Sequence, residues 1–351
     1  MKAVRLYGPL DFRVDDIPMP EPGPGEVLVR TEYCGVCGSD IARGVDGNVP
    51  FTPNTIGHEF SASVAKLGEG VTEFKVGDLV AVMPGIACME CPHCRVGHYG
   101  QCQNWQFIGL RVKDKGAFAE YNVMPKRNLM KLPEGMDPKM GAFLEPMSVA
   151  LHALGQVNFQ CGKDIAIIGA GTIGQLLILC ARALGAKNIY AFDMDDQKLA
   201  FARTLGADYT YNTAKEGFFE AYMGDTDGLG CEQVMEVVGL EKTILLAVDA
   251  CRPVGHIALV GLLGKSVTFP PEYLRKINVN EITFTGVWQS FSLDFPGDEW
   301  RLALHYISKG IIDLEPLLYK VDRMENANAV FEEFKTPGKV QGKIILTFNE
   351  L

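Results

Sequence analysis

The sequence predicts an α/β protein built from two domains, a barrel-like β domain followed by a doubly wound parallel α/β domain. Two patterns predict this fold class: up to residue 154 the chain reads as short strands bounded by Gly or Pro, and from residue 163 apolar strands alternate with helical segments. The length of 351 residues also exceeds what one hydrophobic core usually fills. With 47% hydrophobic and 22% charged residues, the composition is that of an ordinary globular protein.

The first domain, residues 1–154, is expected to be all-β. Residues 1–14 alternate like an opening strand, and four later segments combine an apolar alternation with a Gly or Pro boundary. These four segments are residues 25–35, 61–70, 77–85 and 116–124. Short strands separated by turns are typical of a barrel.

The second domain, residues 155–290, is expected to contain a parallel sheet, because parallel neighbours need crossover connections long enough for a helix. Its predicted strands are residues 164–168, 188–192, 208–212, 231–238, 256–261 and 282–287. The remaining residues, 291–351, contain a helical stretch at 298–310 and a closing strand at 342–348. This segment is expected to return to the first domain.

The charge pattern favours a small molecule as ligand. The formal net charge is −10 and no Lys/Arg run is present, which argues against binding to a nucleic acid backbone. The N-terminal residues contain no apolar signal core, and three glycines, a Gln and an Arg interrupt the long apolar stretch at 165–184. A cytoplasmic protein without a membrane span is therefore expected.

Four closely spaced cysteines predict a structural zinc site. Cys88, Cys91, Cys94 and Cys102 lie in the run CMECPHCRVGHYGQC. Two-residue gaps allow thiolates to converge on one tetrahedral ion, and four sulfur ligands leave no open position for a substrate. The alternative is a pair of disulfides, which the absence of a secretory signal disfavours. Cys34, Cys161, Cys180, Cys231 and Cys251 are interpreted as small buried hydrophobic residues.

A glycine motif at the start of the second domain predicts a dinucleotide site. Gly169, Gly171 and Gly174, with Thr172 and Ile173 between them, follow a strand and open a helix. The glycines permit a tight turn, close approach of a pyrophosphate, and close packing of helix on strand.

The next strand ends at Asp193, where a carboxylate would accept hydrogen bonds from the adenosine ribose. No Arg stands beside Asp193 to receive a 2′-phosphate, so NAD is preferred over NADP. Asp195 and Asp196 are interpreted as the N-cap and first turn of a helix.

A second set of possible metal ligands is spread through the first domain: Cys37, His58, Glu59 and Glu145. Each of them alone could be an ordinary structural residue. Mixed sulfur, nitrogen and oxygen ligands from separated segments leave one position of a zinc ion open, as a catalytic site requires.

In this order, CGVCGSD, GHEF, the four-cysteine run, FLEP, GAGTIG and Asp193 resemble the zinc-dependent medium-chain dehydrogenases over essentially the whole chain. The resemblance implies a GroES-like β-barrel catalytic domain and a Rossmann coenzyme domain. Glu145 stands where classical alcohol dehydrogenases have a cysteine ligand, which indicates the polyol dehydrogenase branch. Within it, FIGLR, GAFAEY, LRK at 274–276 and FPGDEW at 295–300 are similar to the bacterial galactitol-1-phosphate 5-dehydrogenases.

The resemblance implies an NAD-dependent enzyme with one catalytic and one structural zinc per subunit, in a homodimer or homotetramer. Cys37, His58 and Glu145 would hold the catalytic ion, and Glu59 would be a ligand or lie next to one. Ser39 would take the proton of the substrate hydroxyl. Many relatives continue this relay through a histidine where this chain has Ala42, so the last transfer would use water.

The implied reaction oxidises a secondary hydroxyl of a polyol phosphate, most closely galactitol 1-phosphate to tagatose 6-phosphate. The alternative is a sorbitol (L-iditol) dehydrogenase acting on a free polyol. Two other classes fit less well: a redox-inactive NAD-binding protein, and a zinc-free reductase of the same fold, which lacks these ligands. Candidate phosphate-binding residues are Arg43, Arg111, Arg275 and Lys276. Trp288 and Phe291 either line the substrate pocket or contribute only to packing.

Overall fold

The computed structural model describes residues 1–336 and 338–351, and the chain divides into two compact units. Unit 1 comprises Met1–Pro146 and Ser290–Leu351, and unit 2 comprises Met147–Gln289. The predicted boundary after residue 154 falls inside helix α4 (Leu144–Gln156), which begins in unit 1 and ends in unit 2. Among the described residues no helix is long and apolar enough to cross a membrane.

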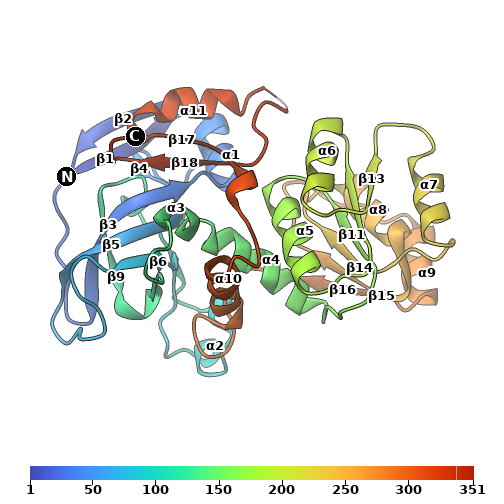
Figure 1. The fold of residues 1–351 in the computed structure, drawn as a ribbon, viewed down its shortest axis with the longest axis horizontal. Coiled ribbons are helices and arrows are strands. Elements are labelled where there is room, and N and C mark those ends of the chain that lie inside the picture. The colour runs from blue at the N-terminus through green and yellow to red at the C-terminus, as the bar shows by residue number, and fades with distance from the viewer. Residues whose placement is uncertain (337) are drawn as a thin grey trace. The chain divides into compact units, whose positions relative to one another are not determined.

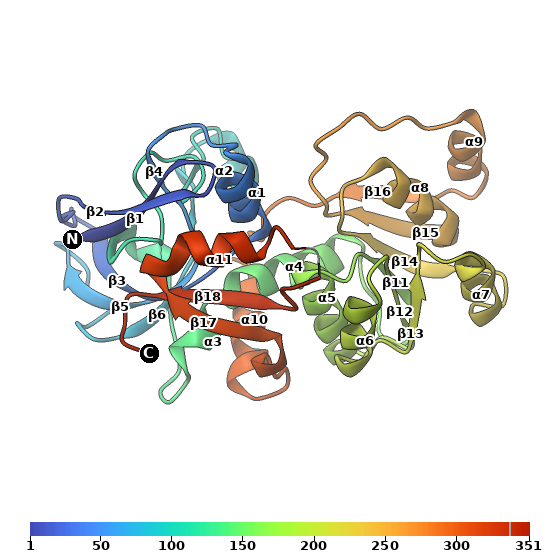
Figure 2. The same cartoon turned by 90° about the horizontal axis from the view of Figure 1, so that it is seen from above.

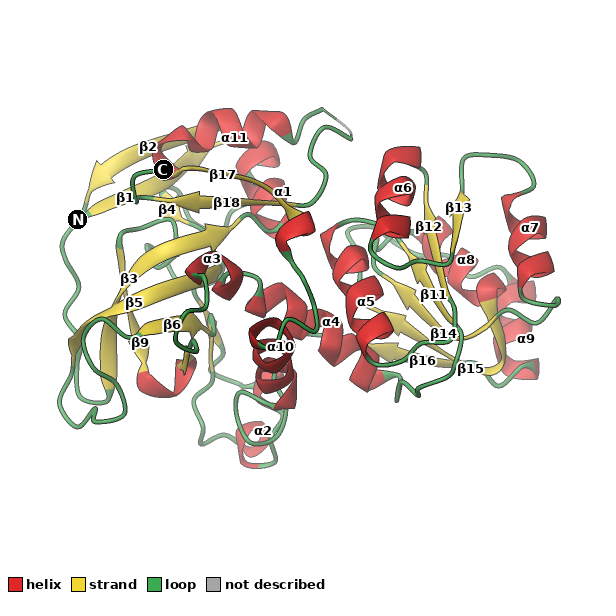
Figure 3. Cartoon of the chain, in the orientation of Figure 1, coloured by secondary structure: helices red, strands yellow, loops and turns green. Residues whose placement is uncertain are grey.

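Strands dominate unit 1 (Figure 3). The strands of its largest sheet, in sheet order, are β10 (Leu129–Lys131), β6 (Leu79–Val82), β5 (Glu59–Leu67), β3 (Glu26–Gly35), β18 (Lys343–Thr347) and β17 (Leu318–Arg323), with β9 (Tyr121–Pro125) also paired to β3. A smaller sheet contains β2 (Asp11–Asp16), β1 (Lys2–Gly8) and β4 (Asn54–Thr55). The predicted strands are confirmed, but 116–124 forms a regular strand only from Tyr121. Apolar side chains of both sheets, including Leu6, Val29, Phe60 and Ile344, share one core.

The end of the chain completes the large sheet. β18 is an uninterrupted buried run, KIILT, that pairs antiparallel with β3 and parallel with β17. Figure 2 shows β17 and β18 side by side near helix α11 (Ala327–Glu333). The predicted helix at 298–310 is confirmed as α10 (Asp298–Ser308). The other short helices of this unit are α1 (Gly38–Asp46), α2 (Pro92–Arg95) and α3 (Pro138–Gly141).

Unit 2 has the predicted doubly wound architecture. In the part of the chain that the structure describes, its strands form one parallel sheet. In sheet order they are β13 (Tyr209–Asn212), β12 (Ile189–Asp193), β11 (Ile165–Ile168), β14 (Cys231–Glu236), β15 (Cys251–Leu259) and β16 (Thr283–Gly286). The strand order reverses beside β11, which is where ligands bind in such sheets.

Helices cover both faces of this sheet, so the central strands are apolar throughout. Figure 1 shows α5 (Thr172–Ala183) and α6 (Asp196–Thr204) on one face, and α8 (Glu241–Ala250) and α9 (Pro271–Val279) on the other. Helix α7 (Phe218–Asp225) follows β13. All four residues of β11 are buried.

Candidate metal centres and dinucleotide site

Three predicted ligands of the reactive metal meet in unit 1. Cys37 is the N-cap of α1, Glu59 is the first residue of β5, and His58 immediately precedes this strand. One ligand atom from each of the three lies within 4.8 Å of the others. His58 and Glu59 are buried, with 3% and 1% of their surfaces exposed. A thiolate, an imidazole and a carboxylate in this arrangement fit a zinc ion.

Strand pairing explains how Glu59 is held. Gly35 of β3 pairs with Glu59 of β5 on one side and with Ile345 of β18 on the other. A Cβ atom at Gly35 would lie 2.5 Å from Glu59 Oε2, so only glycine leaves room for this carboxylate. Lys343 at the start of β18 donates from Nζ to Glu59 Oε2 at 2.5 Å and to Val36 O at 3.3 Å. Glu59 is therefore fixed by an ion pair that joins the two chain segments of unit 1.

The Lys343–Glu59 pair is almost fully buried, with 3% and 2% of the two side chains exposed. Burial alone would lower the pKa of Lys343, but the charges of Glu59 and Cys37 outweigh it and raise this pKa. Sequence reasoning missed Lys343, because no local pattern around it indicates a partner 284 positions earlier.

Replacing Lys343 with Met is expected to lower the free energy of unfolding by about 3 kcal/mol, because it leaves a buried carboxylate without its cation. Urea unfolding measures the change. The matched control is Lys66→Met, which breaks the exposed Lys66–Glu21 pair and should cost less than about 1 kcal/mol. Equal effects of the two substitutions would contradict the structural role of Lys343.

Asp40, in the motif CGSD, is a second residue of this site that no local sequence pattern indicates. It is fully buried, its Oδ2 accepts from Cys37 N at 3.1 Å, and its Oδ1 lies 3.5 Å from His58 Nδ1. Burial lowers the pKa of His58, but the charges of Asp40 and Cys37 raise it well above its ordinary value. Since Nδ1 faces Asp40, Nε2 is the ring nitrogen left for a metal ion.

The two remaining candidates for the reactive site are Glu145 and Ser39. Among the described residues Glu145 lies outside the set that converges within 4.8 Å. Its carboxyl is nevertheless near enough to feel the charges of His58 and Glu59, and burial raises its pKa to about 7. Ser39 lies in the first turn of α1, and its buried Oγ makes no hydrogen bond to any residue that the structure describes.

The four-cysteine lobe, residues 88–102, surrounds α2. The four sulfur atoms all lie within 4.8 Å of one another, and Cys88 Sγ is 3.9 Å from Cys94 Sγ. A tetrahedral zinc ion with bonds of about 2.3 Å separates its sulfur ligands by about 3.8 Å. All ten cysteines are free, so the disulfide alternative is wrong.

The thiols of the lobe ionise unequally. Backbone N–H groups of Gln103 and Cys94 lower the pKa of Cys91 to about 6, whereas burial raises the pKa of Cys94 to about 12. Four thiolates therefore need a bound cation, and loading the lobe would release protons. The donor set fits zinc.

The glycine motif lies at the carboxyl end of β11, as the dinucleotide prediction requires. Gly169 has a φ of 108°, which disfavours a side chain, and Gly171 is the N-cap of α5. A Cβ atom at Gly174 would lie 1.9 Å from Gly169 O, so helix and turn approach too closely for any other residue. The first turn of α5, with Thr172 and Ile173, presents backbone N–H groups suited to a pyrophosphate.

Asp193 ends β12 and lies beside this turn. Its Oδ2 accepts from Ala170 N at 2.8 Å, and its Oδ1 accepts from Asp195 N at 3.1 Å. Asp195 caps α6 by accepting from Gln197 N and Lys198 N, and Asp196 starts the helix, as predicted. The carboxylate of Asp193 is therefore oriented by two backbone donors next to the glycine motif.

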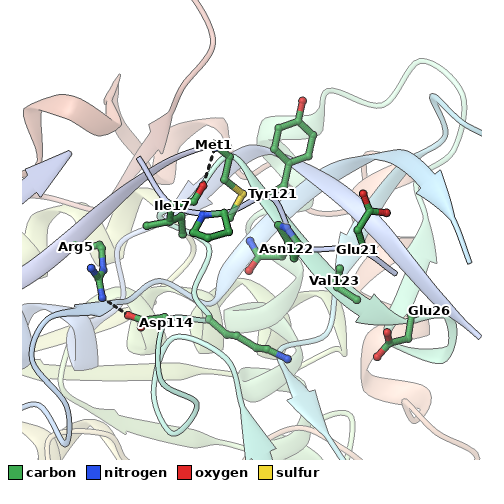
Figure 4. Close-up of a pocket in the computed structure, with 12 residues that line it drawn as sticks. Met1, Arg5, Ile17, Glu21, Glu26, Asp114, Tyr121, Asn122 and Val123 are labelled. Carbon is green, nitrogen blue, oxygen red and sulfur yellow. Dashed lines mark hydrogen bonds and ion pairs between the residues drawn. The ribbon is translucent and has the colours of Figure 1, made fainter. Parts of the chain in front are cut away.

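A cavity of about 470 Å³ in unit 1 is separate from these residues (Figure 4). It is lined by the N-terminal strand, the segment after β2 and strand β9, and includes Arg5, Glu21 and Tyr121. Arg5 donates to Asp114 at 2.6 Å. None of the predicted site residues is among the described residues that line it.

A β domain with a four-cysteine lobe and a mixed-ligand centre, combined with a doubly wound nucleotide domain, defines a zinc-dependent dehydrogenase. Comparison with known proteins agrees. Residues 23–134 match the alcohol dehydrogenase GroES-like domain, and residues 172–306 match the zinc-binding dehydrogenase domain. The chain belongs to the zinc-dependent medium-chain dehydrogenases, in their polyol dehydrogenase branch.

Individual relatives resemble nearly the whole chain. Galactitol 1-phosphate 5-dehydrogenase of Escherichia coli (strain K12) is 38% identical over 318 residues, covering 90% of this chain and 91% of that protein. Sorbitol dehydrogenase of Bacillus subtilis (strain 168) is 30% identical over 342 residues, covering 95% and 94%. The crystal structure of galactitol-1-phosphate dehydrogenase from Escherichia coli has a TM-score of 0.93 and 35% identity, covering 99% of this chain and all of that one.

Proposed function

We propose that this protein oxidises a secondary hydroxyl of a polyol phosphate with NAD, most closely galactitol 1-phosphate to tagatose 6-phosphate. The observation that carries the proposal is the convergence of Cys37, His58 and Glu59 in a buried site of a polyol dehydrogenase fold. The similarity to galactitol 1-phosphate 5-dehydrogenase at 38% identity supports the substrate class. The free cysteines fit the reducing conditions of the cytoplasm.

In the proposed mechanism Cys37, His58 and Glu145 would hold the catalytic zinc, and Glu59 would be a ligand or lie beside one. When bound, zinc supplies Lewis-acid chemistry that lowers the pKa of the substrate hydroxyl. Asp40 lies 3.5 Å from Nδ1 of His58 and balances the charge of this ring, and Lys343 holds Glu59 in place. Cys88, Cys91, Cys94 and Cys102 hold the structural zinc.

Ser39 is the proposed acceptor of the hydroxyl proton. Its Oγ makes no hydrogen bond within the described part of the chain, so no protein partner competes for this hydroxyl. Ala42, three residues further along α1, cannot carry the proton onward. Water would therefore complete the proton transfer, and NAD, when bound, would supply the hydride acceptor.

NAD rather than NADP is the proposed coenzyme, because the carboxylate of Asp193, beside the glycine motif, would repel the 2′-phosphate of NADP. Replacing Asp193 with Ala is expected to shift the ratio of kcat/KM for NAD over NADP towards NADP by about tenfold or more, since one charge–phosphate repulsion is removed. The control is Asp195→Ala, which removes the helix cap of α6 but not the proposed ribose contact. An unchanged ratio in the Asp193 variant would contradict the assignment.

The phosphate of the substrate would be bound by arginine. Arg43 lies on α1 and donates to Ser39 O at 2.5 Å, which brings its guanidinium close to the proposed proton acceptor. Arg111 is exposed. Lys276 pairs with Asp249 at 2.8 Å, so its charge is already balanced by a carboxylate. This pairing favours the second candidate function, which is oxidation of a free polyol.

NAD reduction with galactitol 1-phosphate, galactitol, sorbitol and xylitol distinguishes the two candidates. The proposal predicts a kcat/KM at least about a hundredfold higher for the phosphate, equivalent to roughly 2.7 kcal/mol. A preference for the free polyols would instead identify a sorbitol-type dehydrogenase.

A homodimer or homotetramer is the proposed assembly. β16 is an edge strand of the parallel sheet, and its pattern of burial leaves Thr283 and Gly286 exposed. An edge strand of this kind is available to pair with a second copy of the chain.

A further inference from the structure

A line of aromatic rings in unit 1 connects the four-cysteine lobe with the reactive metal site. We call it the aromatic bridge. In order, its rings belong to Tyr99, Phe295, Phe291, Trp105, Phe107 and His58. The successive ring centroids are 5.3, 5.4, 5.5, 6.2 and 5.4 Å apart. These separations are typical of aromatic contacts.

The first end of the bridge belongs to the lobe itself. Tyr99 lies between the third and fourth cysteines, is 8% exposed, and meets Phe295 edge-on at 90°. A Cβ atom at Gly97 would lie 2.7 Å from Leu293, so the lobe backbone also packs directly on this segment. Trp105 N donates to Cys102 O at 3.2 Å. The conformation of the lobe therefore determines where both Phe295 and Trp105 lie.

The other end of the bridge is the imidazole of His58. Phe107 is 2% exposed and lies on β8 (Gln106–Phe107), where it pairs with Gly85 of β7 (Gly85–Ile86). Its ring meets His58 at 64°, an edge-to-face contact. A Cβ atom at Gly85 would lie 2.3 Å from the Trp105 ring, so this indole is pressed against the backbone of β7.

His58 depends on this packing because its polar contact is loose. Nδ1 is 3.5 Å from Asp40 Oδ1 and makes no hydrogen bond within the described residues. A ring without a short hydrogen bond is oriented mainly by the side chains that pack on it. A metal ligand needs a fixed orientation to bind its ion tightly.

We infer that the four-cysteine lobe positions the reactive metal ligand His58 through the aromatic bridge. The inference rests on the two metal sites of the proposed function and adds a coupling between them. The residues that position His58 in this way are Phe107, Trp105, Phe291, Phe295 and Tyr99. Breaking the bridge should weaken metal binding at the Cys37–His58 site while the lobe keeps its own ion.

The test uses Phe295, which joins the lobe to the rest of the bridge, in the full-length protein with zinc in the lobe and Co²⁺ at the reactive site. Phe295→Leu removes the ring, and Phe295→Tyr keeps it. We expect the Leu variant to release Co²⁺ to a chelator about tenfold faster, with an altered visible spectrum, and the Tyr variant to stay within about twofold of wild type. Phe334→Leu controls for the loss of a half-buried ring elsewhere in the unit.

Wild-type release rates and a wild-type cobalt spectrum in folded Phe295→Leu would overturn the coupling and leave the proposed function intact. A wild-type protein with zinc in the lobe that takes up no Co²⁺ would overturn the reactive metal site, and the coupling with it. If Phe295→Leu does not fold, the pair Tyr99→Leu and Tyr99→Phe tests the same contact from the lobe side. Equal release from these two variants would likewise contradict the inference.

Discussion

Replacing Cys37 with Ser is expected to abolish polyol oxidation while leaving NAD binding intact. Cys37 is the sulfur ligand of the proposed reactive site, and a serine hydroxyl is a poor substitute for a thiolate. Loss of the Lewis acid removes several kcal/mol of transition-state stabilisation, so we expect kcat to fall by about a thousandfold or more. Steady-state NADH formation measures the loss, and coenzyme titration measures the affinity for NAD.

The matched control for this substitution is Cys34→Ser. Cys34 lies three residues earlier on β3, is fully buried, and is outside the group of converging ligands among the described residues. Burial raises the pKa of its thiol well above the ordinary value, so this cysteine is a neutral packing residue. Its variant should keep kcat within about threefold of wild type, whereas near-normal turnover by the Cys37 variant would refute the metal assignment.

Replacing Cys91 with Ser in the lobe is expected to produce the largest loss of stability. Cys91 is buried, and its sulfur lies within 4.8 Å of the sulfur atoms of Cys88, Cys94 and Cys102. With one ligand lost, the lobe should bind zinc weakly, and the free energy of unfolding should fall by about 4 kcal/mol or more. Thermal unfolding and zinc content measure both effects.

Limited proteolysis shows which part of the chain loses stability in this variant. In the Cys91 variant we expect cleavage within residues 88–102, since the lobe contains only short helical turns. Cys161→Ser is the control, because Cys161 belongs to unit 2 and is exposed, so the expectation that this cysteine is buried is wrong. An unchanged melting temperature and a full zinc content in the Cys91 variant would contradict the structural role of the lobe.

The parts of the site that the sequence revealed are those encoded by local spacing. The lobe cysteines are separated by two to seven residues, so the chain itself holds them near one another. Gly169, Gly171 and Gly174 likewise act within a single turn. The parallel sheet could be predicted because strands buried on both faces read as continuous apolar runs.

Contacts that depend on the pairing of distant strands could not be predicted from the sequence. Lys343 meets Glu59 only because β18 inserts beside β3, and a lysine at the start of an apolar strand reads as an ordinary surface charge. The aromatic bridge joins Tyr99 and Trp105 to a segment almost two hundred residues later, and no periodicity marks that contact. Asp40 is an intermediate case. The motif CGSD marks its neighbourhood as a site, but nothing in the motif indicates that this carboxylate is buried beside His58.

The most direct test of a reactive metal site is a zinc titration of the wild-type protein against NADH formation from galactitol 1-phosphate. We expect two zinc ions per subunit, of which a chelator removes one readily, with activity lost and regained in proportion to that one ion. The lobe ion should stay bound throughout, because four thiolates enclose it. Full activity in protein that retains only the lobe zinc would contradict a catalytic ion at Cys37, His58 and Glu145.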